Sequence, residues 1–328
     1  SRAKDYAMRN AGKSYLEIAH AGGGIWDTVT QTRKATQEEL TKSTIKLANR
    51  HLKNGTTTIE VKSGYGLSVD EELKMLRAIK EANITALPDL IPTCLAAHML
   101  PKDFQGTETA YLSEIAERLF PILKSEKLAN RIDAFIEESA FSAQDIKDYF
   151  NTARAMHFDI TVHADQFTPA GSKVAVDYKA LSADHLEAST DNEIATLANS
   201  DTIAVALPGA SIGLGCNFTS ARKLLDAGAA LAIASDHNPG SAPMGDLLTQ
   251  ASILGTFQKL TNAEVLSGIT FRAAAALNLS DRGKLEEGLL ADFAVFHSDN
   301  YQDILYNQGN LKPCMVWKKG NLAYDKHN

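Results

Sequence analysis

From residue 36 onward, apolar runs of strand length alternate with segments that carry apolar residues at helical spacing. Strands alternating with helices predict parallel strands joined by helical crossovers. Capping boxes mark helix starts at Thr36 with Glu39, Ser68 with Glu71 and Thr190 with Glu193, and Ser142 with Asp145 forms a weaker one. The strand-like runs begin at Thr56, Thr85, Arg131, Asp159, Ala180, Asp201 and Ala230.

Seven strands are therefore predicted, each followed by a helix, and one more helix over residues 36–53 precedes the first strand. A (β/α)8 barrel of the TIM type needs eight strands. We predict an α/β barrel of this type whose first strand lies upstream of Ser1. An open doubly wound sheet would carry a glycine-rich phosphate-binding turn after its first strand. The glycines at 22–24 precede a polar stretch and do not form that turn.

The pattern of apolar and polar residues changes near residue 279. Residues 283–296 and 314–325 predict short strands with glycine turns, which is typical of a small β-layer. Two or three strands alone would be marginally stable, so this layer needs partners. We predict a barrel domain over residues 1–278 and part of a small, β-sandwich-like domain over residues 279–328.

Composition narrows the class of protein. The 328 residues are 44% hydrophobic and carry a net charge of −7, which argues against a nucleic-acid-binding protein. The apolar runs are shorter than the roughly 18 residues that a membrane helix needs. Three widely separated cysteines, Cys94, Cys216 and Cys314, predict free thiols in a reducing, cytoplasmic setting.

Polar side chains gather where the predicted strands end, which is where barrels of this type hold their catalytic groups. Imidazoles at two strand ends and a carboxylate at a third predict a metal site with nitrogen and oxygen ligands, suited to Zn²⁺ or Fe²⁺. The strand-end residues are Tyr65, His98, Glu137, Glu138, His163, Asp165, Gln166, Asp184, His185, Glu187, Asp236, His237 and Asn238.

Each of these residues also has a structural interpretation. His163 or His185 alone fits a hydrogen-bonded core histidine, and Asp236 alone fits a turn acid or helix cap. Their joint occurrence at three strand ends favours the metal site. Tyr65 lies between two glycines, which indicates a backbone shaped to approach a ligand. The histidines on or beside predicted helices are interpreted as structural or solvated: His20, His51 and His157.

Several uncommon segments occur in the same order as in a known family. They are the opening 33 residues, "VKSGYGL", "CLAAH", "VHADQF", "DHLE", "SDHNPGS" and "GKLEEGLLAD". With them the chain resembles the imidazolonepropionase family of the amidohydrolase superfamily nearly from end to end. The resemblance implies metal-dependent hydrolysis of the cyclic C–N bond of 4-imidazolone-5-propanoate to N-formimidoyl-L-glutamate, in histidine degradation.

The resemblance also implies roles for individual residues. His163 would be a metal ligand, and Asp236 would be both a ligand and the base that takes a proton from water. His185 would stabilise charge on the attacked oxygen. The substrate-binding residues would be Arg2, Tyr65, His98, Gln166, Asn238, Gly240 and Ser241.

One departure from the family pattern concerns the metal. The superfamily's first strand ends in His-x-His, and in the resembled family this motif lies shortly before the "SR" with which the sequence begins. We therefore expect two further histidine ligands upstream of Ser1. The fourth strand end, "FIEES", carries no lysine to bridge two metals, which favours one divalent ion, Zn²⁺ or Fe²⁺. The family also implies a homodimer and a small-molecule substrate.

Two alternatives stay open. A sibling deaminase acting on a purine- or pyrimidine-like ring would share the barrel and the metal. A glutamate three residues after the fifth-strand histidine would favour it, and Gln166 stands there instead. A glutamine amide cannot carry a proton between groups as an acid can. The second alternative is a non-catalytic binder of a small acid, which applies if the upstream ligands are absent.

Overall fold

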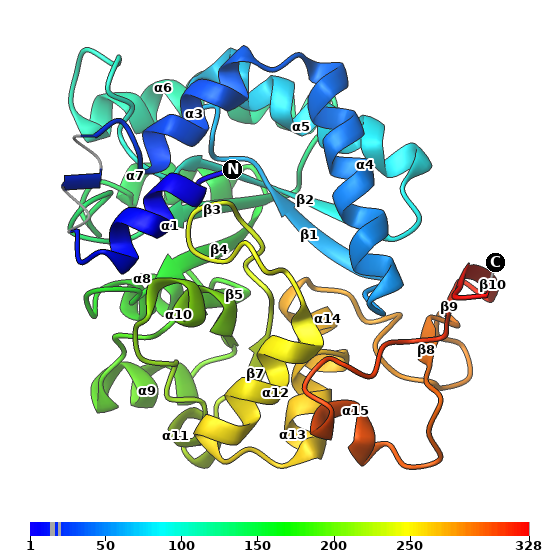
Figure 1. The fold of residues 1–328 in the computed structure, drawn as a ribbon. Coiled ribbons are helices and arrows are strands. Elements are labelled where there is room, and N and C mark those ends of the chain that lie inside the picture. Colours follow the sequence, from blue (N-terminus) through cyan, green and yellow to red (C-terminus); the bar gives the residue numbers. More distant parts are fainter. Residues whose placement is uncertain (14–16, 19–20, 328) are drawn as a thin grey trace.

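The computed structural model describes residues 1–13, 17–18 and 21–327. His20 and part of the opening motif lie outside the described residues. Seven parallel strands form one curled sheet in sequential order (Figure 1). They are β1 (Thr58–Lys62), β2 (Asp89–Ala97), β3 (Arg131–Phe135), β4 (Asp159–Ala164), β5 (Ser182–His185), β6 (Ile203–Ala206) and β7 (Leu231–Ile233). Six of them lie within predicted strand-like runs, and β2 continues past its predicted run, which ended at Thr93, to Ala97. The barrel-type α/β fold is confirmed.

Helices cover the outer face of this sheet and connect consecutive strands (Figure 1). Before β7 they are α4 (Gln37–Lys53), α5 (Val69–Thr85), α6 (Glu108–Ser125), α7 (Lys147–Ala155), α8 (Gly171–Asp177), α9 (Asp191–Ala198), α10 (Pro208–Leu214) and α11 (Ala221–Asp226). The remaining helices are α1 (Ala3–Asn10), α3 (Ile25–Lys34), α12 (Leu247–Gln258), α13 (Asn262–Gly268), α14 (Phe271–Ala276) and α15 (Gln302–Tyr306).

The predicted helix starts have the expected chemistry. Thr36 and Thr190 each form a complete capping box with the glutamate three residues later. The Ser68 hydroxyl accepts from the Glu71 amide and caps α5. Ser142 and Asp145 exchange hydrogen bonds as predicted, but they shape a turn, because α7 begins only at Lys147. Local side-chain bonding thus fixes where most of these crossovers begin.

The main core lies between the sheet and its helices, and one continuous cluster runs from Ala48 on α4 to Leu305 on α15. Within the described residues, β1 and β7 pair on one side only and form the two edges of the sheet. A strand upstream of Ser1 therefore stays a prediction. Within the same residues, no helix is both long and apolar enough to cross a membrane.

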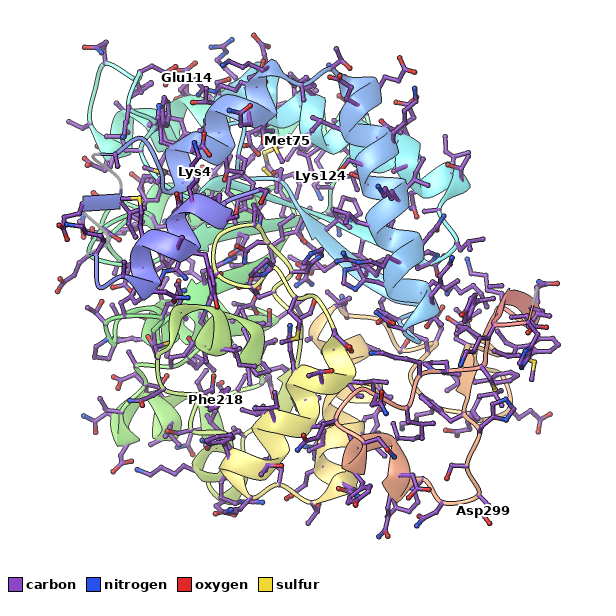
Figure 2. The ribbon with its side chains drawn as sticks, in the orientation of Figure 1. Lys4, Met75, Glu114, Lys124, Phe218 and Asp299 are labelled. Atoms are coloured by element: carbon purple, nitrogen blue, oxygen red, sulfur yellow. The ribbon has the colours of Figure 1, made fainter. Side chains whose placement is uncertain are left out.

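The C-terminal segment forms a second, antiparallel sheet of three strands, β8 (Phe293–Val295), β9 (Met315–Lys318) and β10 (Asn321–Asp325). The predicted small β-layer is confirmed, whereas its status as a separate domain from residue 279 stays a prediction. Arg282 and Lys318 both form ion pairs with Asp89 at the start of β2, so the segment is tied to the barrel. Figure 2 shows its side chains at the periphery, with Asp299 at the outer edge.

Candidate active site

A cavity of about 1020 Å³ opens inside the curled sheet and reaches the loops that follow the carboxyl ends of the strands. All ten residues assigned to the site from the sequence line it. Their individual roles stay predictions, but the structure brings them together at one cavity. They are Arg2, Tyr65, His98, His163, Gln166, His185, Asp236, Asn238, Gly240 and Ser241.

His163 lies near the end of β4, and its ring is within reach of two other imidazoles. Ring centroids are 5.3 Å apart between His163 and His185, and 6.3 Å apart between His163 and His98. Its Nδ1 lies 2.9 Å from the Asp133 Oδ2 on β3. Since Nδ1 faces a carboxylate, Nε2 is the ring nitrogen that remains for a ligand.

Asp236 follows β7 in a turn that its own neighbours hold. The Asn238 Nδ2 donates to the Asp236 Oδ2 over 3.0 Å, and the Ser241 hydroxyl donates to the same oxygen over 3.1 Å. The amides of Gly240 and Ser241 donate to the Asn238 Oδ1. Asn238 and Ser241 therefore orient the Asp236 carboxylate, a contact that the sequence did not reveal.

His185 ends β5 and is almost fully buried, with 2% of its surface exposed. Burial alone would lower its pKa, but the Glu187 carboxylate, followed by Asp236 and Asp184, raises the pKa of His185 to about 9. The His185 Nδ1 lies 3.4 Å from the Glu187 Oε2. At neutral pH the ring is therefore an imidazolium at the edge of the cavity.

Three polar strand ends adopt a left-handed backbone, which side chains other than glycine rarely do. The φ angles are 51° at Asp165, 87° at His185 and 47° at Asp236. Strain of this kind concentrates at functional sites, where surrounding contacts hold it in place. At His185 one such contact is the Thr219 hydroxyl, which donates to its carbonyl over 2.6 Å.

The Tyr65 loop is fixed by one buried carboxylate on α5. Glu72 accepts backbone N–H bonds from Gly64, Gly66 and Leu67, at 3.0, 2.8 and 2.8 Å. A Cβ at Gly64 would lie 2.9 Å from Leu95, and one at Gly66 would lie 2.6 Å from the Glu72 backbone. The two glycines are therefore required by packing against protein, which corrects the interpretation that they allow a ligand to approach. Burial raises the pKa of the Glu72 carboxyl.

His98 directly follows β2, contacts the Tyr65 loop and lines the cavity. Its Nδ1 lies 2.8 Å from the Gly64 carbonyl, so Nδ1 carries the proton and donates. Burial and the neighbouring His163 lower the pKa of His98 to about 4, and the ring is neutral at pH 7. Its Nε2 is therefore an acceptor. The Tyr65 ring lies edge-on to it, with centroids 5.3 Å apart.

Arg2 lies over the loop that follows β7. Its Nε donates to the Asp5 Oδ2 over 2.8 Å, and its side chain is 8% exposed. A Cβ at Gly240 would lie 2.5 Å from the Arg2 Nη1, so the guanidinium lies directly over this glycine. Gln166 is half-buried in the loop after β4 and lines the cavity. The cavity is thus lined by a guanidinium as well as by imidazole and carboxylate groups.

The comparisons with known proteins agree with this geometry. Residues 7–324 match the model of the amidohydrolase family. The chain is 38% identical to an imidazolonepropionase of Bacillus cytotoxicus over 329 residues, covering 99% of the chain and 78% of that protein. The imidazolonepropionase of Alkaliphilus oremlandii is 36% identical over 331 residues, covering 100% of the chain and 78% of that protein. The chain belongs to the imidazolonepropionase family of amidohydrolases.

Solved amidohydrolase-type structures share the fold at low sequence identity. The 5-methylcytosine deaminase of Klebsiella pneumoniae, liganded with phosphonocytosine, has a TM-score of 0.72 at 16% identity, covering 91% of this chain and 79% of its own. An adenosine deaminase of Xanthomonas campestris with bound zinc has a TM-score of 0.70 at 17% identity, covering 94% and 74%. At these identities the likeness supports the barrel architecture alone.

The sequence did not reveal two charged residues on the inner face of the sheet, Lys62 at the end of β1 and Asp133 within β3. The Lys62 Nζ lies 2.7 Å from the Asp133 Oδ2 and 2.8 Å from the Asp184 Oδ2. The available signal was the alternation in "TIEVK" and "RIDAF", which places Glu60 with Lys62, and Arg131 with Asp133, on one face of each strand. In an open sheet that face would meet solvent; here it faces the inside.

The family and the local chemistry indicate a divalent metal in this imidazolonepropionase-type site. His163 has the arrangement of a ligating histidine, because one ring nitrogen faces a carboxylate while the other is left for the ion. The Asp236 Oδ1 is left after Asn238 and Ser241 have bonded to Oδ2. These two donors fit Zn²⁺ or Fe²⁺ in kind, while catalytic zinc commonly has three protein ligands.

Proposed function

We propose that the protein hydrolyses the cyclic C–N bond of 4-imidazolone-5-propanoate and releases N-formimidoyl-L-glutamate, the ring-opening step of histidine degradation. The observation that carries the proposal is one cavity lined by the Arg2 guanidinium together with His163, His185 and Asp236. The imidazolonepropionases of Bacillus cytotoxicus and Alkaliphilus oremlandii, which align over nearly the whole chain, support the same reaction.

The Arg2 guanidinium fits the substrate's propionate group. Arg2 is held by Asp5 through Nε, which leaves its two terminal nitrogens for a carboxylate. A planar guanidinium binds a carboxylate through two parallel hydrogen bonds, which a lysine ammonium does less well. At the ring, Tyr65 and Gln166 line the cavity as hydrogen-bonding groups, and the neutral His98 offers Nε2 as an acceptor for a ring N–H.

A divalent metal, Zn²⁺ or Fe²⁺, would be held by His163 Nε2 and the Asp236 carboxylate, and when bound it supplies an activated water at neutral pH. Asp236 accepts the proton of the attacking water, a general-base contribution of typically 10²–10⁴-fold. His185, already protonated, donates to the oxygen that gains negative charge when the ring carbonyl is attacked.

Asp236 takes up one proton and gives it back within each turnover. The water oxygen bonds to the carbonyl carbon, and the bond from that carbon to the ring nitrogen breaks. The departing nitrogen takes the proton that Asp236 received, so the carboxylate is regenerated. Asn238 and Ser241 bond to Oδ2 and so hold the orientation of the carboxylate through the cycle.

The test follows the loss of 4-imidazolone-5-propanoate absorbance on adding the purified protein, beside an aliquot treated with a chelator. We expect turnover that the chelator abolishes and that zinc or iron restores, with no ammonia formed. Failure to consume this substrate under metal-replete conditions would overturn the proposal.

The deaminase alternative is tested in the same assay, because deamination releases ammonia and ring opening does not. The fold likeness to deaminases is its support, and Gln166 counts against it. A non-catalytic binder would bind the substrate without consuming it. Homodimerisation and a cytoplasmic location remain predictions; light scattering of the purified protein tests the former.

A further inference from the structure

A network of charged side chains lies beneath His163, on the inner face of the sheet. The Lys62 ammonium bonds to Asp133 and Asp184 and lies 3.5 Å from the Glu60 Oε2. The Asp133 side chain is fully buried, and the Asp184 side chain is 7% exposed. The proposed function assigns no role to this network.

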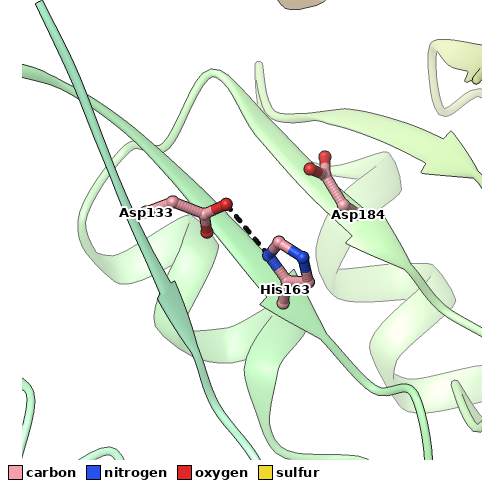
Figure 3. A group of neighbouring side chains, drawn as sticks. All are labelled: Asp133, His163 and Asp184. Atoms are coloured by element: carbon pink, nitrogen blue, oxygen red, sulfur yellow. Dashed lines mark ion pairs between the residues drawn. The ribbon is translucent and has the colours of Figure 1, made fainter. Parts of the chain in front are cut away.

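The same cluster has the spacing of a metal site. One ligand atom each from Asp133, His163 and Asp184 lies within 4.8 Å of the others (Figure 3). However, the Lys62 ammonium already bonds to both carboxylates. A divalent cation at this point would face the like charge of Lys62, whose side chain is 22% exposed, at close range, and like charges repel strongly where water is scarce. The ammonium thus stands where a cation would otherwise bind.

Three of the four carboxylate oxygens already bond to protein groups, and the fourth, the Asp133 Oδ1, is buried without a hydrogen-bond partner among the described residues. Asp184 accepts a 2.8 Å hydrogen bond from the Ser182 hydroxyl in addition to its bond from Lys62. The Asp133 Oδ2 bonds to Lys62 and also lies beside the His163 Nδ1, and Figure 3 shows the contact with His163. The His163 Nδ1 is 2.9 Å from that oxygen, although the ring N–H does not point straight at it. These contacts leave Nε2 as the ring nitrogen without a protein carboxylate.

We propose that Asp133, held by Lys62, is a positioning residue for His163. Asp133 keeps the proton on Nδ1, so that Nε2 is unprotonated and directed at the metal, and Lys62 excludes a metal ion from the opposite side of the ring. This inference rests on the proposed function for the identity of the ion, but not for the state of the ring. A carboxylate behind a ligating histidine fixes its tautomer and raises its basicity.

The first readout is the tautomer of His163 in metal-free protein above pH 8, from ¹⁵N NMR of the imidazole nitrogens. The protein has nine histidines, and a His163→Gln spectrum identifies the signal. We expect the Nδ1–H tautomer in the unaltered protein and a shift towards Nε2–H in Asp133→Ala. A wild-type ring protonated on Nε2 alone would overturn the proposal, whatever reaction the enzyme catalyses.

The second readout is metal affinity, from competition with a chelator of known affinity. We expect Asp133→Ala to weaken binding roughly 10–100-fold, the usual cost of removing such a partner. Asp133→Asn keeps an acceptor oxygen and should retain part of the affinity, and Lys62→Met should fall between wild type and Asp133→Ala. Wild-type affinity in Asp133→Ala would contradict the positioning role.

Asp292→Ala is the matched control. It removes one member of another buried aspartate–lysine pair, between Asp292 and Lys318 in the C-terminal sheet, with side chains 4% and 8% exposed. This variant should lose stability while keeping the His163 tautomer and the metal affinity. If it weakens metal binding as much as Asp133→Ala does, the effect is general destabilisation and the proposal fails.

Discussion

The two halves of the curled sheet carry different inner surfaces. Strands β1, β3, β4 and β5 present charged or ionisable side chains to the inside, including Lys62, Asp133 and His163. Strands β6 and β7 present Val205 and Ala232, and the chemistry there begins only in the loop that holds Asp236. On the apolar half, stability and catalysis are therefore carried by different residues. On the polar half the same side chains serve both.

The largest effect is expected on the apolar half, at Asp236. Asp236→Asn should abolish turnover, a loss of at least 10²–10⁴-fold, because an amide cannot accept the proton of water. The fold should remain, since an asparagine oxygen still accepts from Asn238 and Ser241. Measured kcat and Tm test this together. A variant that keeps a near-normal rate would refute the assigned mechanism.

On the polar half, Lys62→Met should lower both stability and rate. Removing one partner of a buried ion pair leaves uncompensated charge and costs about 3 kcal/mol, which urea unfolding will measure. The rate should fall as well, because Asp133 loses the group that holds it beside His163.

Leu231→Ala sharpens this comparison. Leu231 on β7 is fully buried in the core, so its truncation should cost about 2–5 kcal/mol. Its kcat should nevertheless stay within about twofold of wild type. An equal loss of rate in both variants would mean that destabilisation alone explains the behaviour of Lys62→Met, and the two halves would not differ.

A pH profile isolates His185. With a pKa of about 9, this ring is protonated at neutral pH, so the rate should fall as pH rises through about 9. Glu187→Gln removes the leading cause of the raised pKa, and the alkaline limb should move down towards the ordinary value of 6.5. An unchanged limb in Glu187→Gln would assign the titration to another group.

The smallest effect is on acid stability. Burial, aided by nearby histidines, lowers the pKa of both His51 and His98 to about 4, so both are neutral when folded. Between pH 6.5 and 4 the unfolded chain binds more protons than the folded protein. The free energy of unfolding should therefore decrease as the pH falls from 6.5 to 4. His51→Gln should flatten part of this slope. A pH-independent stability between 6.5 and 4 would contradict the assignment.

Much of the fold was predictable, because the strands and crossovers are encoded locally. The parallel strands coincide with apolar runs that end in polar residues. Thr36 and Thr190 mark the starts of their helices because each forms a capping box with the glutamate three residues later. Pairing across the chain is less visible. The ion pairs of Asp89 with Arg282 and Lys318 join residues almost 200 or more positions apart, and no local pattern indicates them.

The site residues in the loops at the strand ends were predictable from the sequence, but the charged residues on the inner face of the sheet were not. Residues such as His185 and Asp236 follow strand ends, where chemistry is expected, so their position in the sequence reveals them. Lys62 is the last residue of β1 and Asp133 lies inside β3, and both belong to alternating charges that usually indicate a solvated face. Only the curl of the sheet turns that face inward and makes it part of the site. Curvature is a property of the whole sheet and has no local signal.

The absence of a side chain at Gly240 has a consequence for substrate length. A Cβ at residue 240 would lie only 2.5 Å from the Arg2 Nη1, so the loop after β7 sets how closely the guanidinium approaches the ring-opening groups. The distance between the substrate carboxylate and the scissile bond is thus set by Arg2 and Gly240, which are 238 positions apart in the sequence. A library that varies only residue 240 would change the length of acid that the pocket selects, while leaving both the cation and the catalytic groups intact.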